Sequence, residues 1–255
     1  MPYAPSPSRI YYEDYGAGAP VLLAHGIGGN HASWFNQVPT LSKAHRPITF
    51  DHRAFGNSDD DEGIGRSAFV DDIARLLDAL QIDRAVLVGQ SMGGGSTAAF
   101  TCRFPDRVRG LVHCDSLAAV RLDEPYASQL AAVNAATANF SQAERVLGHT
   151  TLANDPERTL LYLQIASFNS VNLKTVKGAP TPWSPYELAA TGVPVLFVAG
   201  EEDVICPPPL IRLMHEQVPG SRYVEIPRAG HSAYFEQPVP FNAALLAFLE
   251  SLPGA

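Results

Sequence analysis

The chain of 255 residues is 46% hydrophobic and 17% charged, a composition typical of a compact globular protein with little disorder. Its formal net charge of −8 disfavours a nucleic-acid partner, because nucleic-acid binding relies on Lys and Arg to neutralise phosphates, so we expect a small, neutral or weakly charged ligand. The start "MPYAPSPSR" lacks a signal-peptide pattern, and no segment approaches the ~18 to 20 apolar residues of a membrane span, so a cytoplasmic protein without membrane contact is expected.

Short β-branched and aliphatic runs alternate with longer amphipathic segments, which predicts an α/β protein with a doubly wound, mostly parallel sheet. Residues 9–16, "RIYYEDYG", indicate an edge strand. Buried strands are expected at residues 20–26, 47–53, 85–91, 110–116 and 194–200, because near-continuous apolarity is typical of a sheet covered on both faces. A last strand is expected at residues 222–226.

The amphipathic segments predict the helices between these strands. One is expected at residues 67–82, with Ser67 as its N-cap. A second runs from near Gly93 to before Pro105, because the residue preceding a proline is disfavoured in the α region. The last is expected at residues 242–252.

Between about Leu117 and Pro185 the alternation stops, and helical patterns follow one another without an intervening strand. Because strands resume at residue 194, this stretch is interpreted as an insertion and not as a second independent domain. We predict a helical cap insertion at residues 117–185, with a core formed by residues 1–116 and 186–255.

The cysteines and acidic residues show no metal or disulfide pattern. Cys102, Cys114 and Cys206 are widely spaced, odd in number and without a CxxC pair, which predicts buried free thiols. The acidic run at residues 59–62 has the charge of a calcium loop but lacks oxygen ligands at its later positions, so a solvated loop is expected. We therefore predict that the protein holds no metal ion.

The stretch "GQSMGG" at residues 89–94 joins a predicted strand to a predicted helix and raises three possibilities. A dinucleotide site requires GxGxxG and a phosphate loop requires a lysine before Ser or Thr; neither is present, so no nucleotide cofactor is expected. The remaining possibility is a nucleophile elbow with Ser91 at its tip, since Gly89 and Gly93 supply the small residues that such a tight turn demands.

A serine nucleophile requires a base that accepts its proton and an acid that orients the base. Of the eight histidines, only His231 lies in a loop between the last predicted strand and the terminal helix, and reacting groups gather at the carboxyl ends of parallel strands. Asp203, just beyond the strand at residues 194–200, is the favoured acid. Asp115 also ends a strand and is its competitor.

Four motifs in order, "HGIGGN", "DHRAFGNSD", "GQSMGG" and "GEEDVICP" with "AGHS", resemble the α/β-hydrolase fold superfamily over essentially the whole chain outside the insertion. The resemblance implies that Ser91 is the nucleophile, His231 the base and then the acid, and Asp203 the orienting carboxylate. It also implies an oxyanion hole formed by the backbone N–H groups of Ile27 and Met92.

The sequence departs from the pattern of the superfamily at two positions. Gln90 stands where many relatives carry His or Asn, and Ala54 replaces the glycine that usually follows the arginine of "DHRAFG". Neither departure removes a catalytic group, but both leave the subfamily open. His25, in the first motif, is expected to support its loop.

The resemblance implies a serine esterase or lactonase that works through an acyl-enzyme, without a cofactor, on a small and largely apolar substrate. A C–C bond hydrolase of a ring-fission diketone, a cofactor-free perhydrolase and a non-catalytic small-ligand receptor that retains the triad are the alternatives. Dehalogenase and epoxide hydrolase activities are disfavoured because they require an aspartate at the elbow. Five aromatic side chains are candidates for lining the substrate pocket, and the alternative is that they pack within the cap. They are Trp34, Phe140, Tyr162, Phe168 and Trp183.

Overall fold

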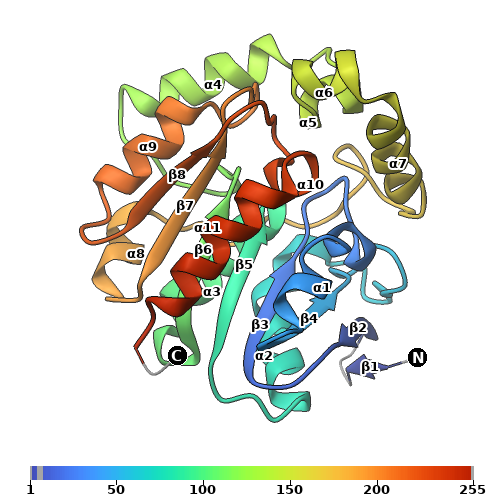
Figure 1. Cartoon of the computed structure of the whole chain (residues 1–255), viewed down its shortest axis with the longest axis vertical. Coiled ribbons are helices and arrows are strands. Elements are labelled where there is room, and N and C mark those ends of the chain that lie inside the picture. Colours follow the sequence, from blue (N-terminus) through green and yellow to red (C-terminus); the bar gives the residue numbers. More distant parts are fainter. Residues whose placement is uncertain (1, 5–7, 254–255) are drawn as a thin grey trace.

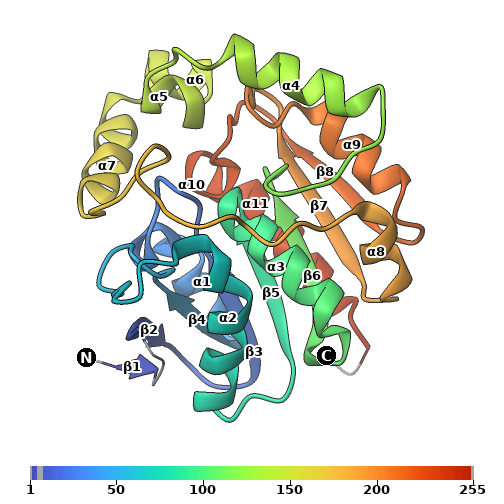
Figure 2. The same cartoon turned by 180° about the vertical axis from the view of Figure 1, so that it is seen from behind.

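The computed structural model describes residues 2–4 and 8–253, and in this part of the chain an eight-stranded sheet lies between two layers of helices (Figures 1 and 2). The strands are β1 (Tyr3–Ala4), β2 (Ile10–Asp14), β3 (Ala19–Ala24), β4 (His45–Phe50), β5 (Ala85–Gln90), β6 (Val108–Cys114), β7 (Val195–Gly200) and β8 (Arg222–Ile226). Their order in the sheet is β1-β2-β4-β3-β5-β6-β7-β8. The pairs β1–β2 and β2–β4 are antiparallel and all the others are parallel, which confirms the predicted mostly parallel sheet.

The helices connect and cover these strands. They are α1 (Val38–Leu41), α2 (Phe69–Ala79), α3 (Met92–Arg103), α4 (Tyr126–Ala136), α5 (Gln142–Val146), α6 (His149–Asn154), α7 (Pro156–Ser167), α8 (Pro185–Ala190), α9 (Pro208–Glu216), α10 (Ala233–Glu236) and α11 (Pro238–Glu250). Three 3₁₀ turns are η1 (His31–Trp34), η2 (Gly65–Ala68) and η3 (Pro105–Arg107). None of the helices in the described residues is long and apolar enough to cross a membrane.

The core consists mainly of two apolar clusters, one on each face of the sheet. In β3, Leu22 belongs to the cluster beneath α2, α3, α8 and α9, whereas Val21 and Leu23 belong to the cluster beneath α1 and α11. Successive residues of a strand point to opposite faces, so a continuous apolar run is required wherever both faces are covered. This is the physical reason why the strand predictions succeeded.

Helices α4 to α7 are consecutive in the chain, and Figures 1 and 2 both show them in a row beyond one end of the sheet. They follow β6 and precede α8 and β7, with no strand of the sheet between them in the described residues. The stretch that departs from the strand–helix alternation in the sequence is therefore helical.

Two local expectations require correction. Ser67 does not cap α2: it lies in η2, and its hydroxyl donates to the Ala179 carbonyl at 3.2 Å, because a 3₁₀ turn precedes the helix. The acidic loop is not simply solvated, because the fully buried Arg53 forms an ion pair with Glu62 at 2.8 Å. Of the three free cysteines, Cys114 and Cys206 are buried and Cys102 is partly exposed.

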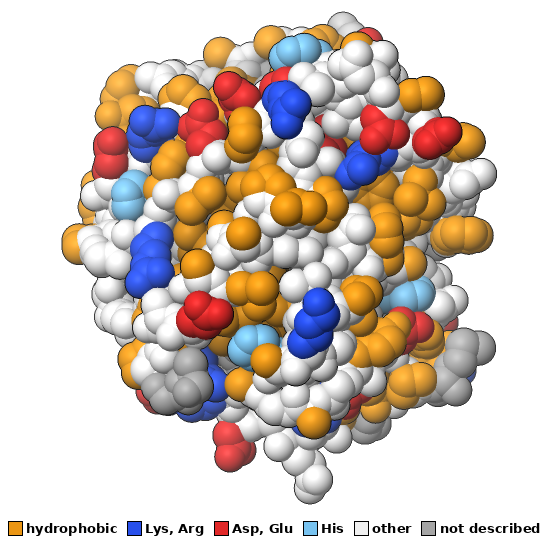
Figure 3. Space-filling model, in the orientation of Figure 1, with side chains coloured by type: hydrophobic (Ala, Val, Ile, Leu, Met, Phe, Trp, Pro, Cys, Tyr) orange, Lys and Arg blue, Asp and Glu red, His pale blue; other side chains and the backbone are white. Residues whose placement is uncertain are grey.

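Charged side chains are dispersed over the face shown in Figure 3. On the face shown in Figure 3, the Lys and Arg side chains of the described residues stand apart from one another among hydrophobic and acidic ones. This face therefore has mixed charge instead of a basic patch.

Candidate active site

Ser91 occupies a sharp turn between β5 and α3. Its backbone has φ 52° and ψ −118°, a left-handed conformation that residues with a side chain rarely adopt. The turn is closely packed: a Cβ atom added to Gly93 would lie 2.2 Å from the Ala24 carbonyl oxygen, and one added to Gly89 would lie 2.2 Å from the Thr97 hydroxyl. Glycine is therefore required two residues before and after Ser91, as the elbow motif predicts.

The predicted base lies beside this serine. His231 Nε2 is 2.8 Å from Ser91 Oγ, and His231 Nδ1 is 2.8 Å from Asp203 Oδ2. His231 and Asp203 are both buried. The structure thus brings the three residues into one continuous chain of hydrogen bonds, in which the carboxylate can orient the imidazole and the imidazole can accept the serine proton.

Asp203 is itself held by its own loop. Its other carboxylate oxygen accepts hydrogen bonds from the backbone N–H groups of Ile205 at 2.9 Å and Cys206 at 2.8 Å. These contacts fix the carboxylate so that Oδ2 faces the imidazole. Such support by groups behind the reacting residues is what keeps a catalytic geometry within a few tenths of an ångström.

Asp115, the competing acid, has a different set of partners. Its two carboxylate oxygens accept backbone N–H groups of Gly200 at 2.7 Å and Ala233 at 3.1 Å, so that it ties the end of β7 to α10. Burial, together with the nearby Asp203 charge, raises the pKa of Asp115 well above its ordinary value. The structure therefore places Asp203, and not Asp115, in hydrogen-bond contact with His231.

Comparisons with known proteins identify the family of the chain. A family model described as the alpha/beta hydrolase fold matches residues 19–238. The chain belongs to the α/β-hydrolase fold family.

Relatives of this α/β hydrolase span its whole length. It is 32% identical to BpoC of Mycobacterium tuberculosis, named as a non-heme bromoperoxidase, over 96% of this chain and 98% of that protein. A solved esterase from Thermogutta terrifontis is similar with a TM-score of 0.79 and 30% identity, covering 97% and 96% of the two chains. Est816, whose structure is titled an N-acyl homoserine lactone degrading enzyme, has a TM-score of 0.80 and 27% identity, covering 97% and 100%.

The two residues whose backbone N–H groups are expected to form the oxyanion hole line one cavity. Met92 is the first residue of α3, so no carbonyl of its own helix accepts its N–H. Ile27 lies in the turn that follows β3, and it lines the same cavity as Met92 and Ser91. Both N–H groups therefore come from chain segments adjacent to the nucleophile, as expected for oxyanion donors.

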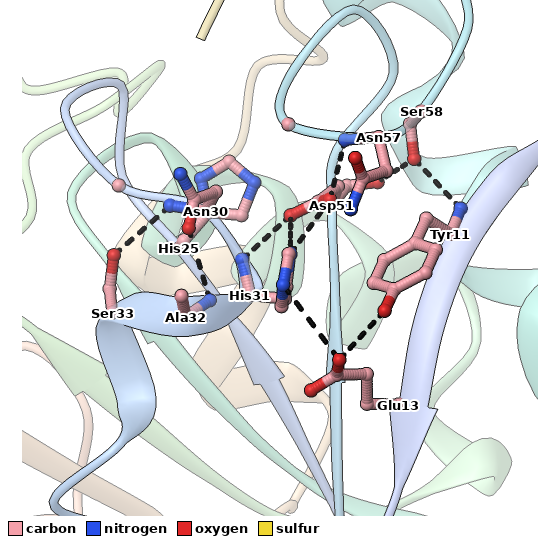
Figure 4. A network of polar contacts seen from close by, with 12 residues as sticks. Tyr11, Glu13, His25, Asn30, His31, Ala32, Ser33, Asp51, Asn57 and Ser58 are labelled. Atoms are coloured by element: carbon pink, nitrogen blue, oxygen red, sulfur yellow. Dashed lines mark hydrogen bonds and ion pairs between the residues drawn. The ribbon is translucent and has the colours of Figure 1, made fainter. Parts of the chain in front are cut away.

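A polar network holds the loop that contains Ile27 (Figure 4). The Asp51 carboxylate, just after β4, accepts the backbone N–H of His31 at 2.6 Å and that of Asn57 at 2.8 Å. Asn30 and Ser33 cap η1 reciprocally, and the Asn30 amide donates to the Ile165 carbonyl in α7 at 3.0 Å. The loop is thus fixed from two sides, by the core and by the inserted helices.

His25 supports this loop, as expected. Its Nε2 accepts the backbone N–H of His52 at 2.9 Å, which assigns the ring proton to Nδ1, and Nδ1 donates to the Gly26 carbonyl at 2.8 Å. Burial lowers the pKa of His25 to about 4. A neutral, fixed ring suits a structural role better than proton transfer.

The cavity at Ser91 has a volume of about 270 Å³ and is lined by core residues and by residues of the inserted segment. The lining residues within 117–185 are Leu117, Ala118, Ala119, Leu130, Asn134, Arg145, Leu173, Pro180 and Thr181. This volume lies near the lower end of small-ligand sites, which indicates a small substrate.

None of the five aromatic candidates is among the described residues that line this cavity. Trp34 and Trp183 are fully buried elsewhere, Trp34 against Tyr234 and Trp183 with its indole N–H donating to the Ala118 carbonyl. Phe140 and Phe168 are 42% and 72% exposed at the surface. Tyr162 is buried, but its hydroxyl packs against Gly28 in the loop that contains Ile27.

Two polar contacts around the site had no sequence signal. The Gln90 amide donates to the backbone carbonyl of His231 at 2.6 Å. The Glu236 carboxylate accepts the N–H groups of Gly230 at 2.8 Å and Gly148 at 2.7 Å, and the Thr151 hydroxyl at 2.6 Å. Glu236 therefore connects the inserted segment to the loop of the base.

Asp203, Cys206 and His231 offer three potential metal-ligand atoms within 4.8 Å of one another. The 2.8 Å contact between Asp203 and His231 is a hydrogen-bond distance. Two ligands of one zinc ion, each about 2.0 Å from the metal at tetrahedral angles, lie farther apart than this. The cluster therefore fits a catalytic triad with a neighbouring thiol better than a metal centre.

Proposed function

We propose that this α/β hydrolase cleaves an ester or lactone bond of a small, largely apolar substrate through an acyl-enzyme on Ser91. The observation that carries the proposal is the Ser91–His231–Asp203 chain of hydrogen bonds, each 2.8 Å between the groups that would transfer or orient the proton. Ser91 and His231 both line a cavity of about 270 Å³. A nucleophile, a base and room for a substrate therefore meet at one place.

In the proposed cycle, Ser91 Oγ attacks the carbonyl carbon while His231 Nε2 accepts the hydroxyl proton. The protonated imidazole is stabilised by the Asp203 carboxylate and then returns the proton to the departing alkoxide. Water, activated by the same nitrogen, releases the acid and restores the serine. A lactone follows the same steps, except that the alcohol stays attached to the acyl group.

The carbonyl oxygen acquires negative charge in each tetrahedral intermediate. The N–H groups of Ile27 and Met92 are proposed to bind it, aided by the positive end of α3. Loss of one such donor typically costs roughly 3 kcal/mol of transition-state stabilisation. Because both donors belong to the backbone, the side chains at these two positions contribute only packing.

Residues 117–185 are proposed to act as a cap that selects the substrate, since this segment supplies part of the cavity wall. The names of two relatives, an esterase and a lactone-degrading enzyme, support an ester or lactone as the scissile group. The small cavity favours a compact substrate over a long acyl chain.

The proposal is tested with a panel of short and long acyl esters, lactones and ring-fission diketones, assayed on the wild type and on Ser91→Ala. We expect ester or lactone turnover that Ser91→Ala abolishes, whereas Ser128→Ala, an exposed serine on α4, retains it. A fluorophosphonate should label the wild type on Ser91. Labelling without turnover of any substrate would support a small-ligand receptor, and turnover confined to the diketones would support a C–C hydrolase.

A further inference from the structure

The cavity at Ser91 differs in charge from the protein as a whole. The chain carries a net charge of −8, yet the described residues that line the cavity include Arg66 and Arg145 and no aspartate or glutamate. The remaining lining is largely apolar, with Phe69, Leu117 and Leu130 among its residues. A local positive charge in an apolar wall favours an anionic group on whatever occupies the cavity.

Arg66 reaches the cavity from η2, on the core side. Its backbone N–H donates to the Lys177 carbonyl at 2.9 Å, and its Nε donates to the Gly178 carbonyl at 3.0 Å. A guanidinium has five N–H donors. The contact with Gly178 therefore fixes the side chain while its two terminal nitrogens have no protein acceptor in the described part of the chain.

Arg145 reaches the cavity from α5, in the inserted segment. One terminal nitrogen donates to the Thr137 carbonyl at 2.9 Å, and no ion pair to a described carboxylate is formed. Arg145 and Cys206 line the same cavity as Ser91 and His231. Burial raises the pKa of the Cys206 thiol well above its usual range, and the Arg145 charge opposes that rise. The backbone N–H of Cys206 in turn bonds to Asp203.

Many arginines in the described part of the chain have carboxylate partners. At least nine others form ion pairs with Asp or Glu. Arg66 and Arg145 are each held by a neutral carbonyl instead, so their charges are positioned but not neutralised. Arg84 is held in the same way, by the Val108 carbonyl, but it does not line the cavity at Ser91. A planar guanidinium in this state matches a carboxylate, which it can bind through two parallel hydrogen bonds.

We propose that Arg66 and Arg145 bind a carboxylate that the substrate carries away from its scissile carbonyl. The inference rests on the proposed function, and it names the substrate class: a monoester of a short dicarboxylic acid, or a lactone with a carboxylate substituent. The apolar lining binds the connecting carbons, and the charge fixes which end of the molecule meets Ser91.

The test compares mono-4-nitrophenyl glutarate with 4-nitrophenyl methyl glutarate, which differ only in whether the distal carboxylate is free or methylated. We expect the wild type to hydrolyse the anionic ester with a kcat/KM about ten- to a hundredfold higher, since hydrogen bonds between charged partners are the strong ones. Arg66→Gln and Arg145→Gln should each reduce this preference, and the double variant should lose it while still hydrolysing the neutral ester. Arg222→Gln, an exposed arginine on β8, is the matched control that should keep it.

A second measurement does not require the variants to fold. Free glutarate should inhibit the wild type competitively and glutaramide should not, and added NaCl should raise KM for the anionic ester alone. Equal turnover of the two esters, or a preference that survives in the double variant, would overturn the carboxylate site and leave the proposed function intact. If neither ester, nor any member of the wider substrate panel, is hydrolysed above the Ser91→Ala background, the proposed function itself fails.

Discussion

The side-chain amide of Gln90 donates a 2.6 Å hydrogen bond to the backbone carbonyl of His231, and both residues are buried. Gln90 directly precedes Ser91, so the neighbour of the nucleophile holds the backbone of the base. Its amide oxygen also lies against the loop that contains Ile27, since a Cβ atom added to Gly26 would be 2.2 Å from this oxygen. One side chain next to the nucleophile therefore connects the loop of the base with the loop that contains Ile27.

Replacing Gln90 by Leu should lower kcat about tenfold or more and change KM little. Without this hydrogen bond the His231 backbone shifts, which misplaces the imidazole for proton transfer but leaves the substrate-binding contacts unchanged. Gln90→His, which keeps an N–H donor at this position, should retain more activity. Steady-state kinetics of both variants with the ester that the wild type prefers would measure the effect. A Leu variant with the wild-type kcat would show that the contact is dispensable.

Asp203→Asn should reduce kcat by about a thousandfold or more, because the amide no longer stabilises the protonated imidazole and favours the wrong tautomer. Asp115→Asn should leave kcat within a few-fold of the wild type but lower the free energy of unfolding by about 1 to 3 kcal/mol, since an amide cannot accept both the Gly200 and Ala233 N–H groups. Kinetics and urea unfolding of both variants separate these roles. A large kcat loss in Asp115→Asn alone would move the acid to β6.

Burial lowers the pKa of His113 to about 4, from an ordinary value of 6.5. Between these pH values the unfolded chain binds a proton that the folded chain does not, so the free energy of unfolding falls as the pH drops from about 6.5 to about 4. His113→Phe, whose ring suits a site between Trp183 and Phe197, removes this titration. Its unfolding free energy should fall less steeply in acid, by about 1 kcal/mol per pH unit.

The matched control for this slope is His149→Gln, because the His149 side chain is 84% exposed. Urea unfolding at several pH values from 7 to 4.5 compares the slopes of the three proteins. The control should keep the wild-type slope. If His113→Phe keeps it as well, another buried group accounts for the acid destabilisation.

The fold and the triad could be predicted because both follow from local patterns. Ser91, Asp203 and His231 each come after a strand of one parallel sheet, whose carboxyl ends meet at one edge, so position along the chain sufficed to bring them together. The elbow could be predicted because Gly89 and Gly93 are the small residues that such a tight turn requires. The two-residue strand β1 was not predicted, because so short a segment has no periodicity.

The cavity lining could not be predicted in the same way. In α7, Leu160, Leu161 and Leu163 are exposed while Tyr162 and Ile165 are buried, so apolar residues occupy more than one face and the pattern does not show which face packs inward. Gln90 and His231 are 141 positions apart in the chain, and their contact exists only after folding. The net charge of the chain likewise does not predict that two arginines line one cavity.

Ala54 illustrates a departure that the fold tolerates. Its φ of 70° lies in the left-handed region, which favours glycine, the residue that the family resemblance leads one to expect at this position. An alanine there is strained, yet the residue leaves all three members of the triad in contact. The departure therefore concerns stability and not the chemistry of the site.

Glu236 limits how this enzyme can change its specificity. Its carboxylate spans from Gly148 and Thr151 to Gly230, directly beside the base. A chimera could receive the helices of another family member without donors at positions 148 and 151. The Glu236 carboxylate would then be buried beside the imidazole without two of these three donors. Exchange of specificity by recombination should therefore succeed only when the exchanged fragment includes both the helices and the Glu236 loop that they contact.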